Sequence, residues 1–251
     1  MRRGFSIEGK RVIVTGAAGG IGQAVARRLA ENGARVALLD VARVADATAA
    51  FAADLPGDCR AITADVTDPN ALAEAFAAVD TAFGGLDGLV NNAGITRAED
   101  VFDITLESWR DVIDINMTGA FLCAKLAMER FRAQGEGGRI VQMGSVVGHQ
   151  GALKGHLHYS ASKSALHGMS RTLARTGAAF GVTVNTVAPG LVRTPLIDTA
   201  HGDGAEMAAA VPLGRLAEPS EIAAAVHFLL SDDAGYITGA VIDVNGGMHM
   251  R

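Results

Sequence analysis

Short apolar runs rich in β-branched residues recur along the chain, and most are followed by a longer segment with the spacing of a helix. Runs of this kind are typical of strands buried on both faces, as in a parallel sheet. Strands are expected at 11–15, 34–40, 60–65, 86–91, 138–144, 181–188 and 240–244. The alternation predicts an α/β fold of the Rossmann type, a doubly wound parallel sheet of about seven strands with helices on both faces.

Helices are expected at 23–31, 44–55, 69–83, 109–131, 159–180 and 219–230. The segment 69–83 shows the pattern most clearly, because its apolar residues share one helical face. The segment 109–131 is long but carries Asn116 and Gly119 in its interior, and both residue types lower helix stability. A kink is therefore expected there, which could free a backbone carbonyl and hold a water near Asn116.

The segment 16–22 joins the first strand to the first helix and contains the glycines Gly16, Gly20 and Gly22. Glycines allow a tight turn and let a diphosphate approach the N-terminus of a helix, where N–H groups and the helix dipole favour an anion. An ordinary glycine-rich turn is the alternative. The strand–turn–helix context favours phosphate binding.

Asp40 ends the second strand. An acid at this point accepts hydrogen bonds from ribose hydroxyls and repels a 2′-phosphate. No Arg or Lys occurs between 15 and 22, and Arg43 is the nearest cation along the chain. The pattern favours NAD(H) over NADP(H), although Asp40 could also be a plain turn residue.

Two further strand ends carry polar residues. Asp65 and Val66 follow the third strand, and Asp65 is placed to meet the adenine edge or to cap the helix expected near Pro69. The fourth strand ends in 91–94, the sequence Asn-Asn-Ala-Gly. Its amides could tie neighbouring loops together while Gly94 leaves room for a cofactor, or the segment could be a simple turn.

Tyr159 and Lys163 are four residues apart on an expected helix, so their side chains share a face. A phenol has an ordinary pKa of about 10, and a neighbouring ammonium lowers it. The pair thus suits general acid–base chemistry at a carbonyl. Ser145 follows the fifth strand at the edge where ligands of such sheets bind, and can hydrogen-bond a substrate oxygen.

Three irregular segments are expected around this chemistry. Pro189 and Gly190 fix a turn after the sixth strand, from which Thr194 could reach the cofactor. The polar, Ala-rich segment 196–211 is expected to be a mobile substrate lid. The His- and Gly-rich loop 146–158 is either a polar wall of the substrate pocket or a solvated surface loop, and its histidines lack the partners of a metal site.

The composition excludes several functions. The chain has 251 residues, 49% of them hydrophobic, which suits a single domain over 1–251. A net charge of −5 without a basic block disfavours nucleic acid. No secretory signal and no apolar run long enough for a membrane span is evident. Cys59 and Cys123 lack CxxC spacing, so a reducing cytoplasm is expected and a disulfide or zinc site is not.

With these elements in place, the chain resembles the short-chain dehydrogenase/reductase family over nearly its whole length. The resemblance rests on the glycine loop 15–22, the Asp65–Val66 pair, the segment 91–94 and the turn 189–194. It also rests on four residues that match the family's catalytic tetrad in order, namely Asn116, Ser145, Tyr159 and Lys163.

The resemblance implies a role for each residue. Tyr159 would be the general acid in reduction and the base in oxidation, and Ser145 would position the substrate oxygen. Lys163 would lower the pKa of Tyr159, hold the nicotinamide ribose and connect through water to Asn116. The implied cofactor-binding residues are Gly16, Gly20, Ile21, Gly22, Asp40, Asp65, Val66, Asn92, Ala93, Gly94, Tyr159, Lys163, Pro189, Gly190, Val192 and Thr194. No metal is expected.

The leading hypothesis is an NAD(H)-dependent oxidoreductase that acts on CH–OH groups and interconverts a secondary alcohol and a ketone. Polyols, sugars, hydroxy acids and cyclic or steroidal alcohols all stay open as substrates. The main alternative is a 3-oxoacyl thioester (acyl carrier protein) reductase. A cofactor-sensing protein and a nucleotide-sugar epimerase are weaker alternatives, because the tetrad is intact and the chain has no separate substrate domain.

The resemblance also implies a homotetramer. The expected contacts are the helices 109–131 and 160–180 and the last strand, with the tail 248–250 buried at the interface.

Overall fold

A computed structural model describes residues 5–194 and 204–250. Its sheet has seven parallel strands in the order β3-β2-β1-β4-β5-β6-β7 within these residues, which confirms the doubly wound fold. The chain starts at the centre of the sheet, moves to one edge and then crosses to the other. The strands are β1 (Arg11–Thr15), β2 (Arg35–Asp40), β3 (Cys59–Thr63), β4 (Gly88–Asn91), β5 (Gly138–Met143), β6 (Val182–Pro189) and β7 (Val241–Val244).

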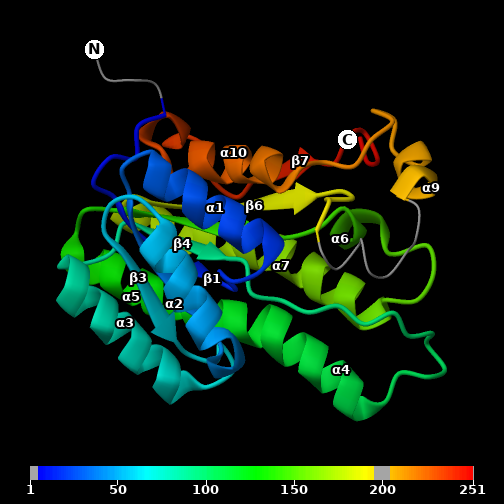
Figure 1. Ribbon diagram of the computed structural model, residues 1–251, viewed down its shortest axis with the longest axis horizontal. Helices are drawn as coiled ribbons and strands as arrows, with labels where there is room; N and C mark the ends of the chain where they lie inside the picture. Colours follow the sequence, from blue (N-terminus) through cyan, green and yellow to red (C-terminus); the bar gives the residue numbers. More distant parts are fainter. Residues whose placement is uncertain (1–4, 195–203, 251) are drawn as a thin grey trace.

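Helices cover both faces of the sheet (Figure 1). One apolar cluster joins α1, α2 and α10 to the sheet, and a second joins α3, α5 and α7 to the opposite face. The described helices are α1 (Gly20–Glu31), α2 (Ala45–Asp54), α3 (Pro69–Phe83), α4 (Leu106–Ile113), α5 (Gly119–Gln134), α6 (Val147–Gln150), α7 (Leu157–Gly177), α9 (Gly204–Ala209) and α10 (Pro219–Leu230).

The start of α3 corrects one prediction. Asp68, and not Asp65, caps this helix, since its carboxylate accepts hydrogen bonds from the N–H groups of Asn70 and Ala71. Asp68 stands directly before the first helical residue, which is the position from which a side chain reaches the free N–H groups. The Asp65 carboxylate instead accepts two 2.8 Å hydrogen bonds from Thr67 and so holds the preceding turn.

The expected kink in the segment 109–131 takes the form of a π-helical turn at Asp114–Thr118 between α4 and α5. Here the N–H of Gly119 bonds to the carbonyl of Asp114, five residues back. Gly119 also packs against Val66, where an added Cβ would lie 2.6 Å from a methyl carbon. Since π-turns are common at functional sites, the position of Asn116 inside this one supports its prediction as a functional residue.

Several boundaries differ from the sequence predictions. Helix α1 begins inside the glycine loop, at Gly20 and not at residue 23. A side chain at Gly22 would collide with the Gly16 carbonyl, so glycine is required in this first turn. The predicted loop 146–158 contains the short helix α6, and α7 begins at Leu157. In the predicted lid 196–211, residues 196–203 lie outside the described residues and the remainder includes α9.

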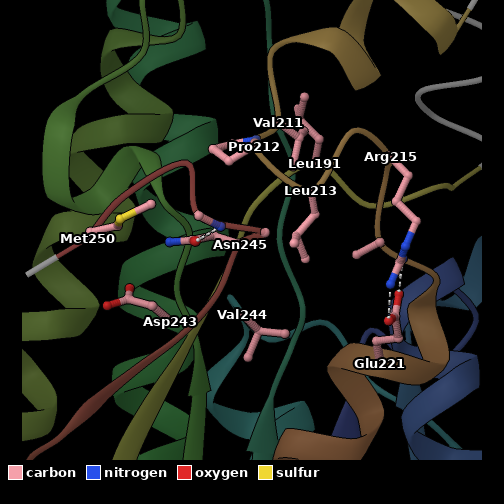
Figure 2. A pocket seen from close by; sticks show the side chains of 13 residues that line it. Leu191, Val211, Pro212, Leu213, Arg215, Glu221, Asp243, Val244, Asn245 and Met250 are labelled. Atoms are coloured by element: carbon pink, nitrogen blue, oxygen red, sulfur yellow. Dashed lines mark hydrogen bonds and ion pairs between the residues drawn. The ribbon is translucent and has the colours of Figure 1, made fainter.

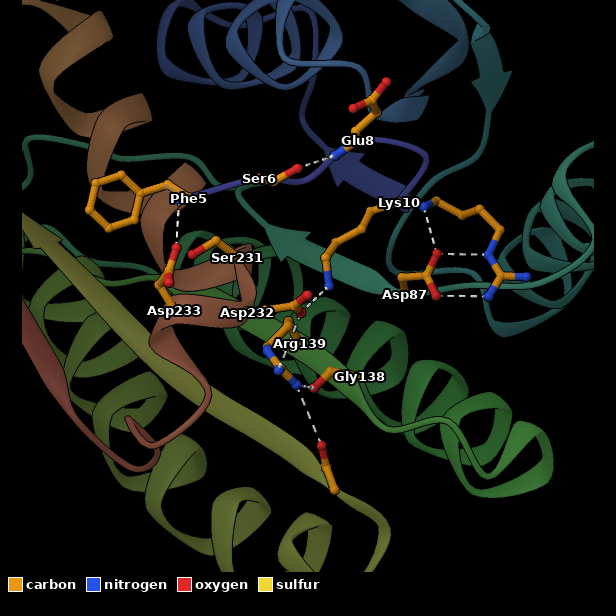
Figure 3. Close-up of polar contacts among 12 residues, drawn as sticks. Phe5, Ser6, Glu8, Lys10, Asp87, Gly138, Arg139, Ser231, Asp232 and Asp233 are labelled. Atoms are coloured by element: carbon orange, nitrogen blue, oxygen red, sulfur yellow. Dashed lines mark hydrogen bonds and ion pairs between the residues drawn. The ribbon is translucent and has the colours of Figure 1, made fainter. Parts of the chain in front are cut away.

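The end of the sheet opposite the predicted site is held together by ion pairs (Figure 3). The guanidinium of Arg11 donates two 2.7 Å hydrogen bonds to the two carboxylate oxygens of Asp87, and the Arg11 N–H adds a third. Burial raises the pKa of Asp87, but the bonds from Arg11 outweigh it and hold this pKa below its usual range. Lys10 joins Asp232 beside them at 2.7 Å.

Candidate active site

The glycine loop is packed against the segment that follows β4. The side-chain amide of Asn92 donates to the carbonyls of Thr15 and Gly16 at 3.0 and 2.9 Å. An added Cβ on Gly16, whose φ is 63°, would lie 2.8 Å from the Cα of Ala93, and one on Gly22 would collide with the Gly16 carbonyl. The prediction that the amides of 91–94 tie two loops together is therefore confirmed in geometry.

Thr15 has a role that the sequence did not reveal. Its hydroxyl accepts 3.0 Å hydrogen bonds from the N–H groups of both Asn92 and Ala93. The sequence signal that was available for this role is a threonine at the last position of β1. The hydroxyl fixes the spacing between the first and fourth strand ends, where a ligand would lie.

The N-terminus of α1 suits an anionic group. Gly19 is the N-cap and provides no side-chain hydrogen bond, and the first turn, with Gly20 and Ile21, contains no acidic residue. Free N–H groups and the positive end of the helix dipole thus face the loop without a protein carboxylate near them in the chain. This donor set fits the diphosphate of a dinucleotide.

Asp40 lies at the end of β2 with its carboxylate held beside the glycine loop. One oxygen accepts from the Ala18 N–H at 2.8 Å, and the other accepts from the Val41 N–H at 2.9 Å. The negative charge is thus fixed next to the loop rather than turned to solvent. Farther along this edge Asp65 is exposed and Val66 is buried against Gly119.

Tyr159, Lys163 and Ser145 come together where β5 ends against α7. The Lys163 Nζ atom lies 5.5 Å from the centroid of the Tyr159 ring, which confirms that the two side chains share a helix face. Ser145 is buried, and its hydroxyl acts on Tyr159 in the direction that lowers the pKa of the phenol. The cluster therefore holds a phenol, a hydroxyl and an ammonium within one small site.

The pKa of Tyr159 is shifted in the direction opposite to the sequence-based prediction, which expected Lys163 to lower it. Burial raises the pKa of Tyr159, and the hydrogen bond with Ser145 acts in the opposite direction without cancelling it. Burial also lowers the pKa of Lys163 to about 8. The Lys163 ammonium donates a 2.7 Å hydrogen bond to the Met143 carbonyl, so its expected effect on the pKa of Tyr159 stays a prediction.

Asn116 is held rigidly next to this cluster. Its side-chain oxygen accepts from the Ile95 N–H at 2.8 Å, and its amide donates to the Ile95 carbonyl and to the Ser162 hydroxyl at 2.9 and 3.0 Å. A Cβ on Gly94 would lie 3.2 Å from Asn116 Oδ1 and 3.6 Å from Lys163 Nζ. Asn116 and Lys163 therefore both lie close to Gly94, and the water link between them stays a prediction.

The turn after β6 completes the same edge. The Pro189 carbonyl accepts from the Val146 N–H at 2.8 Å, which fixes the turn beside the loop that carries Ser145. A Cβ on Gly190 would lie 2.9 Å from the Cα of Asn245. Val192 forms a bridge with Ala217, and Thr194 is the last described residue before the gap.

The histidines of the loop 146–158 each bind another part of the chain. His149 lies 2.9 Å from an oxygen of Asp243, and His156 lies 2.9 Å from the Thr96 hydroxyl. His158 is buried and pairs with Glu99 at 3.1 Å. The solvated-loop alternative is wrong for these side chains, whereas the pocket-wall alternative is not tested.

Within 5–194 and 204–250, no group of three or more His, Cys, Asp or Glu residues is arranged to hold a metal ion.

A cavity of about 410 Å³ lies between the segments 211–217 and 243–250 (Figure 2). Its walls are mainly apolar, and its charged pair Arg215 and Glu221 is joined by 2.7 Å hydrogen bonds. None of the four predicted catalytic residues lines it. Val211, the last residue of the predicted lid 196–211, is one of its lining residues.

None of the described helices is both long enough and apolar enough to cross a membrane.

Comparisons with known proteins identify relatives of this chain. A family model described as Enoyl-(Acyl carrier protein) reductase matches residues 16–249. The 3-oxoacyl-[acyl-carrier-protein] reductase FabG of Escherichia coli is 42% identical over 247 residues, which cover 98% of this chain and 100% of that protein. The cis-4-hydroxycyclohexanecarboxylate dehydrogenase of Sinomonas cyclohexanicum is 43% identical over 237 residues, or 94% of each chain.

A solved structure gives the same result for the fold. The short-chain type dehydrogenase/reductase from Mycobacterium marinum superposes with a TM-score of 0.93 at 34% identity and covers 98% of each chain.

Proposed function

The chain belongs to the short-chain dehydrogenase/reductase family and is an oxidoreductase, and we propose that it interconverts a secondary alcohol and a ketone with NAD(H). The observation that carries the proposal is the cluster of Tyr159, Ser145 and Lys163 at the carboxyl edge of the sheet. This edge is where ligands of doubly wound sheets bind.

The proposed chemistry is a proton transfer at the substrate oxygen. A bound nicotinamide cofactor supplies or accepts the hydride. In reduction Tyr159 donates its proton to the carbonyl oxygen, and Ser145 donates a hydrogen bond to the same oxygen and stabilises the charge that develops there. In oxidation Tyr159 takes the proton back. Burial raises the pKa of Tyr159, so the phenol carries its proton at neutral pH before reduction.

We propose NAD(H) as the cofactor because of Asp40. Its carboxylate is fixed by two backbone N–H groups beside the glycine loop, at the end of the second strand. A carboxylate there accepts hydrogen bonds from the ribose hydroxyls, and its negative charge repels a 2′-phosphate. In the same proposal the diphosphate lies at the N-terminus of α1 with Gly16, Gly20, Ile21 and Gly22, and the adenine lies near Asp65 and Val66.

The rest of the cofactor site follows from the same edge. Asn92, Ala93 and Gly94 border the ribose next to Lys163. The nicotinamide is oriented by Pro189, Gly190, Val192 and Thr194.

A second candidate, 3-oxoacyl thioester reductase, is supported by the identity of about two residues in five with several FabG proteins over the full length of each. The relative from Sinomonas cyclohexanicum, a cis-4-hydroxycyclohexanecarboxylate dehydrogenase, supports the secondary-alcohol hypothesis. The two candidates use the same Tyr159 chemistry and differ in substrate and cofactor.

Initial rates separate the candidates. Oxidation of cis-4-hydroxycyclohexanecarboxylate, polyols and sugars is measured with NAD+ and NADP+, and reduction of an acetoacetyl thioester with NADH and NADPH. We expect a higher kcat/KM with NAD(H) and turnover of at least one secondary alcohol. Thioester reduction with NADPH as the preferred cofactor, and no alcohol oxidation, would establish the second candidate and overturn the first.

We also propose a homotetramer in the cytoplasm, joined through α4, α5, α7 and β7. The cysteines support a reducing compartment, since Cys59 and Cys123 are both free thiols. The exposed side chains of Leu106 and Phe121 on α4 and α5 support an interface there. Sedimentation velocity tests the assembly, and a monomer at micromolar concentration would contradict the proposed tetramer.

A further inference from the structure

The first turn of α7, which carries Tyr159, lacks an ordinary cap. The N–H groups of a first helical turn have no partner within the helix, and a side chain at the N-cap normally satisfies one of them. Here the N-cap is His156, whose backbone is in the left-handed region with φ of 57° and whose side chain makes no capping bond. The hydrogen bond comes instead from a side chain within the first turn itself.

His158 supplies it. The ring is fully buried, and its Nδ1 atom accepts a 3.1 Å hydrogen bond from the N–H of Tyr159. An accepting Nδ1 places the proton of a neutral imidazole on Nε2. That Nε2 atom lies 3.1 Å from the Glu99 carboxylate and donates to it. The two ring nitrogens therefore join the backbone of Tyr159 to Glu99.

Glu99 is itself fixed. Its carboxylate also accepts a short hydrogen bond from the Ser108 hydroxyl on α4. The bonds from Ser108 and His158 hold the pKa of Glu99 below its usual range, so the acceptor is ionised at neutral pH. Hydrogen bonds to a charged acceptor are about twice as strong as neutral ones. The arrangement connects α4, the segment before it and the start of α7.

The segment 95–99 makes three such connections to the catalytic elements. Ile95 holds the side chain of Asn116 through two backbone hydrogen bonds. Thr96 binds His156 at 2.9 Å, and Glu99 binds His158. The segment begins directly after Gly94, which adjoins both Asn116 and Lys163. One short segment thus braces two of the four proposed catalytic residues.

We propose that His158 and Glu99 are positioning residues that lock the backbone of Tyr159 against the segment 95–99 and so aim its hydroxyl at the substrate. The inference rests on the proposed function, since it takes Tyr159 to be the acid and base. A displacement of about 1 Å from the productive geometry can cost on the order of 100-fold in rate. Loss of the His158–Glu99 contact is therefore expected to lower kcat. A pair that serves stability alone would change the melting temperature and leave kcat unchanged.

Matched substitutions separate the two bonds of His158. His158→Asn keeps an acceptor at the distance of Nδ1, His158→Gln places an amide at the distance of Nε2, and His158→Ala removes both. We expect kcat to fall about tenfold or more in His158→Ala, with intermediate values in the other two. The KM and the dissociation constant of NAD+ are expected to stay within about twofold of wild type, because the brace contacts neither ligand directly.

His227→Ala is the control for loss of a buried histidine. His227 lies on α10 and bonds to the Phe5 carbonyl, far from Tyr159 in the chain and on the opposite face of the sheet. It is expected to lower the melting temperature while kcat stays within about twofold. Equal kcat losses in His227→Ala and His158→Ala, or an unchanged kcat in His158→Ala, would overturn the inference.

Glu99→Ala keeps the test valid if the His158 variants do not fold, because Glu99 is only partly buried. It is expected to lower kcat by an intermediate amount, because it removes one of the two bonds of His158. The double variant Glu99→Ala/His158→Ala is expected to lose no more than His158→Ala alone, as partners in one network do. Additive losses would show that the two residues act separately and would contradict the proposal.

Hydrogen exchange distinguishes a failure of this inference from a failure of the proposed function, since it needs no turnover. Peptides that cover 95–105 and 157–163 are expected to exchange faster in Glu99→Ala than in wild type. If wild type turns over no alcohol or ketone, the proposed function fails while this readout still tests the lock. If exchange in both peptides is unchanged by Glu99→Ala, the lock does not exist, whatever the activity.

Discussion

The ammonium of Lys163 donates a 2.7 Å hydrogen bond to the backbone carbonyl of Met143, the last residue of β5. The bond anchors the side chain two residues before Ser145 and next to the ring of Tyr159. It also provides the one buried ammonium of the site with an acceptor in place of water. The end of β5 and the helix α7 are thereby held in register at the point where the proposed chemistry occurs.

The buried ammonium leads to a prediction about stability and pH. Burial lowers the pKa of Lys163 to about 8 from its ordinary 10.5, so the unfolded chain binds more protons between these values. The contribution of Lys163 to stability therefore rises with pH across this window, and below it the charged side chain is at its most costly. Urea titrations at pH 7 and pH 10 measure the free energy of unfolding of Lys163→Met and of wild type. The difference, variant minus wild type, is expected to be more positive at pH 7 than at pH 10.

Lys125→Met is the control for that measurement, because Lys125 lies on α5 with 60% of its side chain exposed. Its effect on the free energy of unfolding is expected to be the same at both pH values. A pH-independent difference between Lys163→Met and wild type would contradict the burial effect.

Asp40 leads to a prediction about the cofactor. Asp40→Ser removes the charge that repels a 2′-phosphate, so kcat/KM with NADP+ relative to NAD+ is expected to rise by at least about tenfold, equivalent to about 1.4 kcal/mol. Steady-state kinetics at saturating alcohol measure the ratio. Asp54→Ser, at the exposed end of α2, is expected to leave it unchanged. An unchanged ratio in Asp40→Ser would show that Asp40 does not select the cofactor.

The glycine loop leads to a prediction about binding. A Cβ at Gly22 would collide with the carbonyl of Gly16, a backbone atom that cannot move without opening the loop. Gly22→Ala is therefore expected to weaken NAD+ binding at least tenfold, or about 1.4 kcal/mol, by calorimetric titration.

Gly168→Ala, in the middle of α7, is the matched control for the glycine loop. Nothing lies within 4 Å of its added Cβ, so binding is expected to stay unchanged and the fold to gain up to about 1 kcal/mol. Tight NAD+ binding by Gly22→Ala would contradict the loop assignment.

The ion pair at the far end of the sheet leads to a prediction about acid stability. Asp87→Asn is expected to lower the free energy of unfolding by about 1–2 kcal/mol at pH 7, since it weakens three hydrogen bonds to a partly exposed pair. The pKa of Asp87 is depressed, so this stability is present above its unfolded pKa and is lost as the pH falls through the lower folded value.

Chemical denaturation at pH 7 and pH 3 measures how much Asp87→Asn lowers the free energy of unfolding relative to wild type. This loss is expected to be smaller at pH 3. Glu136→Gln removes a mostly exposed carboxylate 3.7 Å from the same arginine and is expected to change little at either pH. A loss from Asp87→Asn that persists undiminished at pH 3 would contradict the ion-pair account.

The elements of the fold were predictable from sequence wherever their signals are local. The runs that became β1 and β6 are rich in β-branched residues, and α3 has a proline at its start and a glycine after its end. For the cap of α3 the signal was ambiguous, and of the two roles expected for Asp65 the capping role is wrong. Two acids three residues apart, Asp65 and Asp68, both suit a cap, and backbone geometry alone chooses between them.

The site shows the same division. The position of Tyr159 beside Lys163 follows from helical spacing, which a sequence contains. The pairing of His158 with Glu99 joins residues 59 positions apart, and no periodicity specifies it. The anchoring of Lys163 on a backbone carbonyl has no sequence signal either, because every residue carries a carbonyl.

The central claim is that Tyr159 is the general acid and base of an alcohol–ketone oxidoreductase. Replacing Tyr159 by Phe keeps the ring and removes only the hydroxyl, and kcat for the best substrate of the alcohol screen is measured together with the dissociation constant of NAD+. The account predicts a fall in kcat of roughly 10²–10⁴-fold, with NAD+ binding within about twofold of wild type. Turnover by Tyr159→Phe close to the wild-type rate would contradict it.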